Sequence, residues 1–126
     1  MKISRKEASF SQLTSAINHF QEEDFCCSIT LAAAAEGILP ETESPYIFKE
    51  LQGIDGLEPN LIINLLKHGT DYDYIEVDKA ESVLIIVRAI SKFIAVHHQS
   101  CSAFEGFLRD AHEKHGFPVN LRKEQS

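Results

Sequence analysis

The chain is 126 residues long, a length at which a single domain buries about two-thirds of the surface of its unfolded form, so one hydrophobic core is expected. Hydrophobic residues make up 44% of the chain and charged residues 25%, a composition that excludes general disorder. Acidic residues outnumber basic residues by 19 to 12, and the formal net charge of −7 disfavours nonspecific nucleic-acid binding.

The N-terminal half of the chain predicts two helices in succession. Ser4 and Glu7 have the S-x-x-E spacing of a capping box, which places the start of the first helix at Ser4. Its apolar stripe has helical spacing: Phe10, Leu13, Ile17 and Phe20. Acidic residues 22–24 end this helix and cap the second, which runs from Phe25 to about Leu39. The second helix is apolar on nearly every side, so we expect it to be central.

The middle of the chain predicts a short helix and then a longer one. Ser44 and Pro45 are a cap and a first-turn proline for a short helix through about Leu51. Pro59 opens the next helix and Gly69 closes it. The apolar stripe of that helix consists of Leu57, Leu61 and Leu65, with His68 one turn on. Residues 70–77 are interpreted as a connector, because one extended run cannot form a sheet alone.

The C-terminal part predicts a long buried helix and an amphipathic one. Asp78 and Glu81 repeat the capping signature before a helix from Lys79 to about His98, which is apolar nearly all round. Ser102 and Glu105 are predicted to cap a last helix that ends at Gly116 and Pro118. Its inward residues are expected to be Phe104, Phe107, Leu108 and Ala111.

These elements predict an all-α fold, a bundle of four main helices plus one short helix. Residues 1–118 are predicted to form a single domain and residues 119–126 a flexible tail. A small bundle cannot easily bury the whole apolar surface of two helices that are apolar on all sides. A homodimer is therefore predicted.

The chain carries no pattern for export or for membrane insertion. The first ten residues lack the apolar stretch of a secretory signal, which favours a cytoplasmic protein. The longest apolar stretch, residues 83–96, is too short for a bilayer and contains Arg88 and Lys92. We interpret it as a buried helix.

The cysteines and histidines match no common metal or cofactor signature, so no metal site and no cofactor are predicted. Cys26, Cys27 and Cys101 have neither CxxC spacing nor a disulfide framework, and reduced, buried thiols are expected. His112 and His115 are three residues apart without further ligands nearby. They are interpreted as a solvated helix end, and His19 as a residue at the boundary of its helix's apolar stripe.

A group of polar residues on apolar helices is the candidate site. Glu36 and Arg88 each interrupt an apolar helix and therefore need a partner. Asn64 and His68 are four residues apart on one face of their helix, with Lys67 close by. Together these groups could bind phosphate or move a proton. The alternative is structural: a Glu36–Arg88 ion pair that fixes helix register, with the amide and imidazole holding the loop after the helix.

Three short motifs, ITLAAAAEGILP, NLLKHG and VRAIS, resemble those of a group of small uncharacterised bacterial helical proteins that is HEPN-like. The resemblance covers about residues 16 to 96. It implies a helical bundle that dimerises, in a class that includes RNA-cleaving toxins and inactive binding modules. Active HEPN nucleases carry an Arg, a polar residue and a His within one helix. Here Asn64 and His68 match, no Arg precedes them on that helix, and Arg88 is the candidate replacement from a neighbouring helix.

The leading functional hypothesis is a HEPN-like, dimeric module that binds a small anionic ligand or a protein partner. The expected ligand-binding residues are Glu36, Asn64, Lys67, His68 and Arg88. The alternative is a metal-independent RNA endonuclease with His68 as general acid or base and Arg88 or Lys67 stabilising the charge on the phosphoryl group. A purely structural interaction protein is the third possibility.

Overall fold

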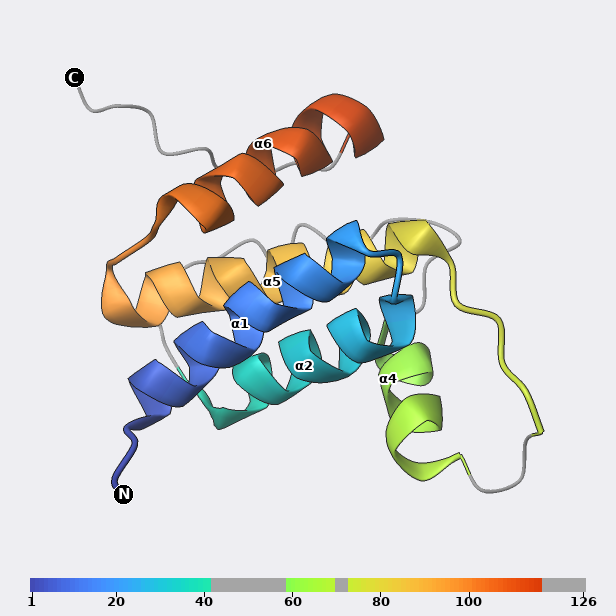
Figure 1. The fold of residues 1–126 in the computed structure, drawn as a ribbon, viewed down its shortest axis with the longest axis horizontal. Coiled ribbons are helices and arrows are strands. Elements are labelled where there is room, and N and C mark those ends of the chain that lie inside the picture. Colours follow the sequence, from blue (N-terminus) through green and yellow to red (C-terminus); the bar gives the residue numbers. More distant parts are fainter. Residues whose placement is uncertain (42–58, 70–72, 117–126) are drawn as a thin grey trace.

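The computed structural model describes residues 1–41, 59–69 and 73–116, which fold into helices without a strand. Figure 1 shows their arrangement. In chain order the helices are α1 (Arg5–Gln21), α2 (Phe25–Ile38), α4 (Pro59–His68), α5 (Lys79–His97) and α6 (Ser102–His115). The predicted all-α class is confirmed for this part of the chain. The predicted short helix ending near Leu51 and the tail of residues 119–126 lie outside the described residues.

The first two helices form a hairpin (Figure 1), and both begin at the predicted caps. The Ser4 amide donates to Glu7 Oε1 at 3.0 Å and the Glu7 amide donates to Ser4 Oγ at 3.0 Å, which completes the capping box of α1. Asp24 is the N-cap of α2, where its Oδ1 accepts from the Cys27 amide at 3.2 Å. Because both caps are local, they could be predicted from residue spacing.

The long helix α5 also begins at its predicted cap. The Asp78 amide donates to Glu81 Oε1 at 3.4 Å, and Asp78 Oδ1 accepts from the Ala80 amide at 3.0 Å. The helix ends at His98, whose φ of 54° is left-handed. Residues 73–77 before it form neither helix nor strand, as the connector prediction requires.

The predicted cap of α6 is wrong by one residue. Cys101 is the N-cap, without a side-chain hydrogen bond, and Ser102 is already helical. Glu105 accepts a hydrogen bond from Ser100 Oγ at 2.6 Å instead of pairing with Ser102. The end of the helix is as predicted, since Gly116 supplies a left-handed C-cap with φ 69°.

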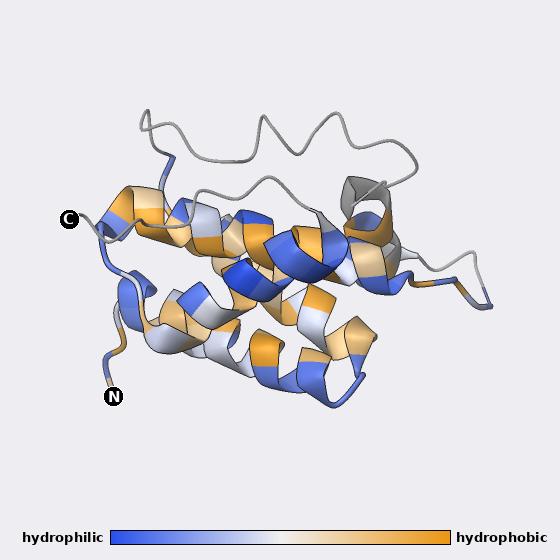
Figure 2. Cartoon of the chain, turned by 90° about the horizontal axis from the view of Figure 1, so that it is seen from above, coloured by the Kyte–Doolittle hydropathy of each residue, from blue (hydrophilic) through white to orange (hydrophobic). Residues whose placement is uncertain are grey.

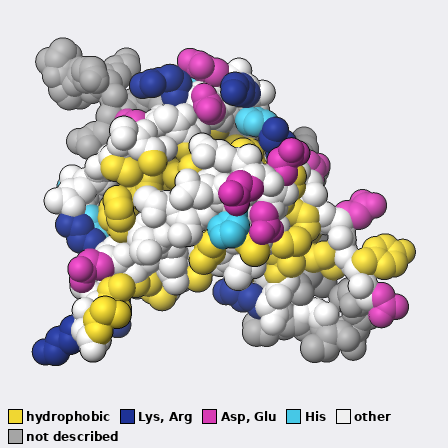
Figure 3. All heavy atoms as spheres, viewed as in Figure 1, with side chains coloured by type: hydrophobic (Ala, Val, Ile, Leu, Met, Phe, Trp, Pro, Cys, Tyr) yellow, Lys and Arg dark blue, Asp and Glu magenta, His cyan; other side chains and the backbone are white. Residues whose placement is uncertain are grey.

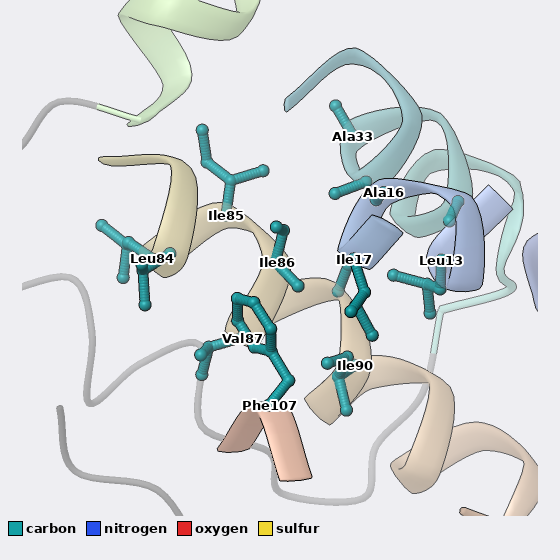
Figure 4. Packing of buried hydrophobic residues seen from close by; sticks show 14 of the residues in the cluster. Leu13, Ala16, Ile17, Ala33, Leu84, Ile85, Ile86, Val87, Ile90 and Phe107 are labelled. Atoms are coloured by element: carbon teal, nitrogen blue, oxygen red, sulfur yellow. The ribbon is translucent and has the colours of Figure 1, made fainter. Parts of the chain in front are cut away.

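The core is built around α5, which packs against all of the other described helices. Every residue from position 81 to 90 is buried, so this helix has no solvent-facing side over that stretch. Figure 4 shows Ile86 and Ile90 of α5 near Ile17 of α1 and Phe107 of α6. Two buried hydroxyls tie α5 to α2, because Ser28 Oγ and Ser82 Oγ share a hydrogen bond of 2.8 Å.

The second apolar helix, α2, is central as predicted, but one of its faces is exposed. It packs against α1, α4 and α5 and buries residues along one face. Thr30 and Gly37 are exposed on the other face. Most exposed α2 side chains are small, so leaving them in water costs little apolar burial. Since α5 is covered by its own chain, the surplus of apolar surface is smaller than predicted, and the homodimer stays a prediction.

The predicted burial of the thiols is also wrong. Cys26 and Cys27 are exposed and Cys101 is partly buried, although all three are free of disulfides, as expected. Both exposed thiols lie in the first turn of α2, where Ser28 and Ile29 are the residues that reach the core. The preference of cysteine for the interior is statistical, and the position on the helix decides the outcome.

The surface is mixed in charge and the helices are amphipathic. Coloured by hydropathy in Figure 2, hydrophobic stretches alternate with hydrophilic ones along the described helices. On the face drawn in Figure 3, acidic side chains lie among Lys and Arg side chains. Of the helices that the structure describes, none combines the length and the apolar content that crossing a membrane requires.

Candidate functional site

Glu36 and Arg88 meet, as the sequence predicts for two charges on apolar helices. Glu36 lies in the last turn of α2 and Arg88 in the middle of α5. Arg88 Nε donates to Glu36 Oε1 at 3.0 Å, and Arg88 Nη2 lies 2.9 Å from the same oxygen. The side chains are 7% exposed for Arg88 and 14% exposed for Glu36, so this is a largely buried ion pair.

A second cation, Lys92, joins this pair from the next turn of α5. Its Nζ donates to the backbone carbonyl of Glu36 at 3.2 Å. That carbonyl also accepts from the Leu39 amide at 3.3 Å, so Lys92 helps to close the C-terminal end of α2. Nζ lies 3.9 Å from Glu41 Oε1, on a side chain that is 97% exposed.

Sequence reasoning did not include Lys92 among the candidate site residues. Arg88 and Lys92 are four residues apart, a spacing that puts both side chains on the same face of a helix. Two cations at this spacing in an otherwise apolar stretch could therefore have predicted that Lys92 lies in the same polar site as Arg88.

The two cations of this site have different carboxylate partners among the described residues. Arg88 and Lys92 are each 7% exposed, and Arg88 pairs with the mostly buried carboxylate of Glu36. The other carboxylate, on Glu41, is in water and almost 4 Å away. A salt bridge to so exposed a group is weak because solvent screens it. Among the described residues, Lys92 is therefore a buried ammonium with only a weak ionic partner.

The other predicted site residues lie on α4. Asn64 and Lys67 are both exposed on α4, whose described core residues are Ile62 and Ile63. Asn64 was predicted to lie on the apolar face of its helix together with His68. In the structure its side chain is exposed to water. His68 ends α4, but its side chain is outside the described part of the structure, so its predicted role is untested.

One histidine in the described structure has a shifted pKa. His97, in the last turn of α5, packs its ring 4.9 Å from that of Phe93, and its Nε2 is buried without a hydrogen bond among the described residues. Burial lowers the pKa of His97 below its ordinary value of 6.5, and the positive charges of Lys6 and His98 lower it further. This imidazole is therefore held neutral at physiological pH.

A small cavity lies apart from these charges, between α1, α5 and α6. Its volume is about 100 Å³, and Phe20, Val83 and Phe107 line it together with Lys79 and Lys114. None of the predicted site residues reaches it.

The chain was compared with family models, curated proteins and solved structures. It matches no family model, no curated protein and no solved structure. The geometry around Glu36, Arg88 and Lys92 is therefore the basis on which a function can be inferred.

Proposed function

We propose that the protein is a non-catalytic helical binding module that holds a small oxyanion, a carboxylate or phosphate group, at Arg88 and Lys92. The observation that carries this proposal is the buried ammonium of Lys92, whose side chain is 7% exposed and whose carboxylate partner among the described residues, on Glu41, is 97% exposed and 3.9 Å away. Buried charge without compensation is unfavourable, and a bound anion supplies the missing negative charge. A guanidinium and an ammonium are the usual donors for such groups.

We infer that an anion reaches the site from the side of Glu41. The carboxylate of Glu41 lies 3.9 Å from Lys92 Nζ, and its side chain is 97% exposed. An exposed side chain held by one weak ion pair is readily displaced, so a small anion can take its place beside the ammonium. Glu41 is thus a competitor for the site, supplied by the chain itself.

Glu36 holds the guanidinium in position for this anion. Two nitrogens of Arg88 contact Glu36 Oε1, which fixes the plane of the guanidinium against α2. The Glu36–Arg88 pair also fixes the register of α2 against α5, which is the structural role that the sequence suggested. In this proposal the same ion pair therefore has both a structural role and a role in binding. Asn64 and Lys67, which are exposed on α4, are not required by this proposal.

Isothermal titration of the full chain with inorganic phosphate, and separately with succinate, tests the proposal. Lys92→Met keeps the length of the side chain and removes its charge, and we expect at least about a tenfold weaker Kd, equivalent to about 1.4 kcal/mol. Glu41→Gln removes the competing charge and should tighten binding by about two- to fivefold, the range of an exposed ion pair. Lys114→Met is the matched control, since the Lys114 side chain is 70% exposed and its Nζ lies 4.0 Å from Asp110 Oδ2.

Opposite effects of the Lys92 and Glu41 variants, with no effect at Lys114, are the expected result. Absence of phosphate and succinate binding in the unmodified protein overturns the proposal. So does an equal loss in the Lys92 and Lys114 variants, because a general effect of surface charge would then explain the binding. Far-ultraviolet circular dichroism of each variant shows whether the helices are retained.

We also propose that this module is a HEPN-like homodimer. The supporting features are the resemblance of the sequence motifs and an aromatic ring at the surface. Phe10 is 40% exposed, although its ring lies 5.5 Å from that of Phe104 and 6.1 Å from that of Phe93. Light scattering should give twice the mass of the 14.2 kDa chain. A monomer at micromolar concentration contradicts this part of the proposal and leaves the anion site untouched.

A further inference from the structure

The turn between α1 and α2 gathers three side chains of the kinds that bind transition metals. His19 lies in the last turn of α1, Asp24 is the N-cap of α2, and Cys27 lies in the first turn of α2. One donor atom from each of the three lies within 4.8 Å of the other two. Sequence reasoning predicted no metal site, because the spacing of these residues is not among the common metal signatures. The three side chains come close together because the chain turns between α1 and α2.

The separation of the donor atoms fits a tetrahedral ion. His19 Nδ1 lies 3.4 Å from Asp24 Oδ2. In a zinc site with bonds of about 2.0 to 2.3 Å, tetrahedral geometry puts neighbouring donor atoms about 3.4 Å apart. The imidazole and the carboxylate are therefore already at the spacing that the ion needs. Cys27 is exposed, so its side chain is free to rotate by the remaining distance.

The backbone of the turn fixes two of these ligands. The Asp24 amide donates to the His19 carbonyl at 2.8 Å, and Glu23 closes the turn with a left-handed φ of 63°. Asp24 Oδ1 accepts from the Cys27 amide at 3.2 Å, which directs Oδ2 toward the imidazole. A ligating carboxylate whose second oxygen is held by a hydrogen bond is typical of established metal sites.

The imidazole nitrogen at the centre of this group lacks a hydrogen bond. His19 Nδ1 is buried from solvent and has no hydrogen-bond partner among the described residues, although the side chain as a whole is 37% exposed. A bound ion would supply the partner that this nitrogen lacks.

We propose that His19, Asp24 and Cys27 bind Zn²⁺ through three protein ligands, with the fourth position open to water or an exogenous ligand. An imidazole, a carboxylate and a thiolate together suit a borderline ion such as zinc, whereas Mg²⁺ and Ca²⁺ prefer oxygen ligands alone. The ion joins the end of α1 to the start of α2. Binding therefore stabilises the hairpin as well as presenting an open coordination position.

Titration of the full, reduced chain with Co²⁺ tests the site, because a thiolate ligand gives cobalt a charge-transfer absorption that Zn²⁺ then abolishes by displacement. Cys27→Ser should lose this absorption, and His19→Gln should bind Co²⁺ at least about tenfold more weakly. Asp24→Asn should weaken binding similarly while keeping the helix cap, since Asn caps as well as Asp does. Cys26→Ser is the matched control, an exposed neighbouring thiol that should leave the absorption unchanged.

A second measurement reports on binding without cobalt. Zn²⁺ should raise the thermal midpoint of the unmodified protein and of Cys26→Ser, but not that of Cys27→Ser. The proposal is overturned if the reduced chain gives no thiolate absorption with Co²⁺, if the absorption survives in Cys27→Ser, or if it disappears in Cys26→Ser instead. Phosphate titration of Cys27→Ser should match that of the unmodified protein, so failure of the zinc site is distinguishable from failure of the anion site.

Discussion

The Glu36–Arg88 ion pair removes two opposite charges from most of their contact with water, and each charge depends on the other. Arg88→Met alone leaves the carboxylate buried beside Lys92 without its guanidinium, and Glu36→Leu alone leaves the guanidinium without its carboxylate. Removing one partner of a buried pair costs about 3–5 kcal/mol, whereas replacing both by apolar residues is often nearly neutral. Urea denaturation should therefore show that the double variant is more stable than either single variant.

The comparison of single and double variants also tests where the pair lies. If both single variants change the free energy of unfolding by less than about 0.5 kcal/mol, the charges behave as surface residues and the described burial is contradicted. Arg109→Met on α6, which removes an exposed guanidinium, is the control and should be close to neutral.

His97 makes stability depend on pH in a direction set by its lowered pKa. The neutral form fits the folded protein, while the unfolded chain binds a proton at the ordinary value of 6.5. Below that pH the unfolded state therefore takes up more protons, and the contribution of His97 to stability is lost as pH falls from 6.5 toward the lowered folded pKa. Thermal unfolding should show a lower midpoint at acidic pH than at neutral pH.

A variant separates this effect from general acid sensitivity. His97→Gln cannot gain the charge, so the drop in thermal midpoint between neutral and acidic pH should be smaller than in the unmodified protein. His98→Asn, at the exposed left-handed cap, should keep most of the drop. Equal pH dependence in the unmodified protein and in His97→Gln contradicts the account.

The start of α5 is the element whose cap matters most, because this helix packs against every other described helix. Asp78 satisfies the Ala80 amide at 3.0 Å. Asp78→Ala should lower the free energy of unfolding by about 1 kcal/mol, and Asp78→Asn by less, since Asn is an equally good N-cap. Denaturant unfolding measures both, and an Ala variant as stable as the Asn variant contradicts a capping role.

Helix starts could be predicted where the cap residues bond to each other and not to the rest of the fold. The capping boxes at Ser4 and Asp78 are of this kind, and both predictions are confirmed. At α6, Glu105 had two serines within reach, and it bonds to Ser100 and not to Ser102. The exposed side of α2 could not be predicted because its composition is apolar all round, so periodicity does not indicate which side faces water.

At the scale of the whole molecule, some features of the candidate sites could be predicted from the sequence and others could not. The Glu36–Arg88 contact could be predicted because each charge interrupts an apolar helix and needs a partner. The exposure of Asn64 could not be predicted, because the rotation of α4 about its own axis depends on how the helix packs against α2 and α5. The cluster of His19, Asp24 and Cys27 depends on how one turn folds, which residue spacing alone does not determine.

The nuclease alternative, which the HEPN-like resemblance raised, is a separate prediction for the whole protein. The proposed module is non-catalytic, so purified protein should leave total RNA intact. Cleavage that disappears in His68→Ala would favour the nuclease over the binding module, and cleavage that persists in that variant would indicate a contaminant.

The most direct test of the central claim follows the Arg88 side chain itself. Arg88 Nε donates a hydrogen bond to Glu36 inside the protein, so its N–H should give a sharp, exchange-protected nuclear magnetic resonance signal, assigned by its loss in Arg88→Lys. With increasing phosphate at constant ionic strength, we predict a saturable shift of this signal and no comparable shift of the Arg109 Nε signal. An Arg88 signal that does not move, or that moves no more than that of Arg109, contradicts an anion site at Arg88 and Lys92.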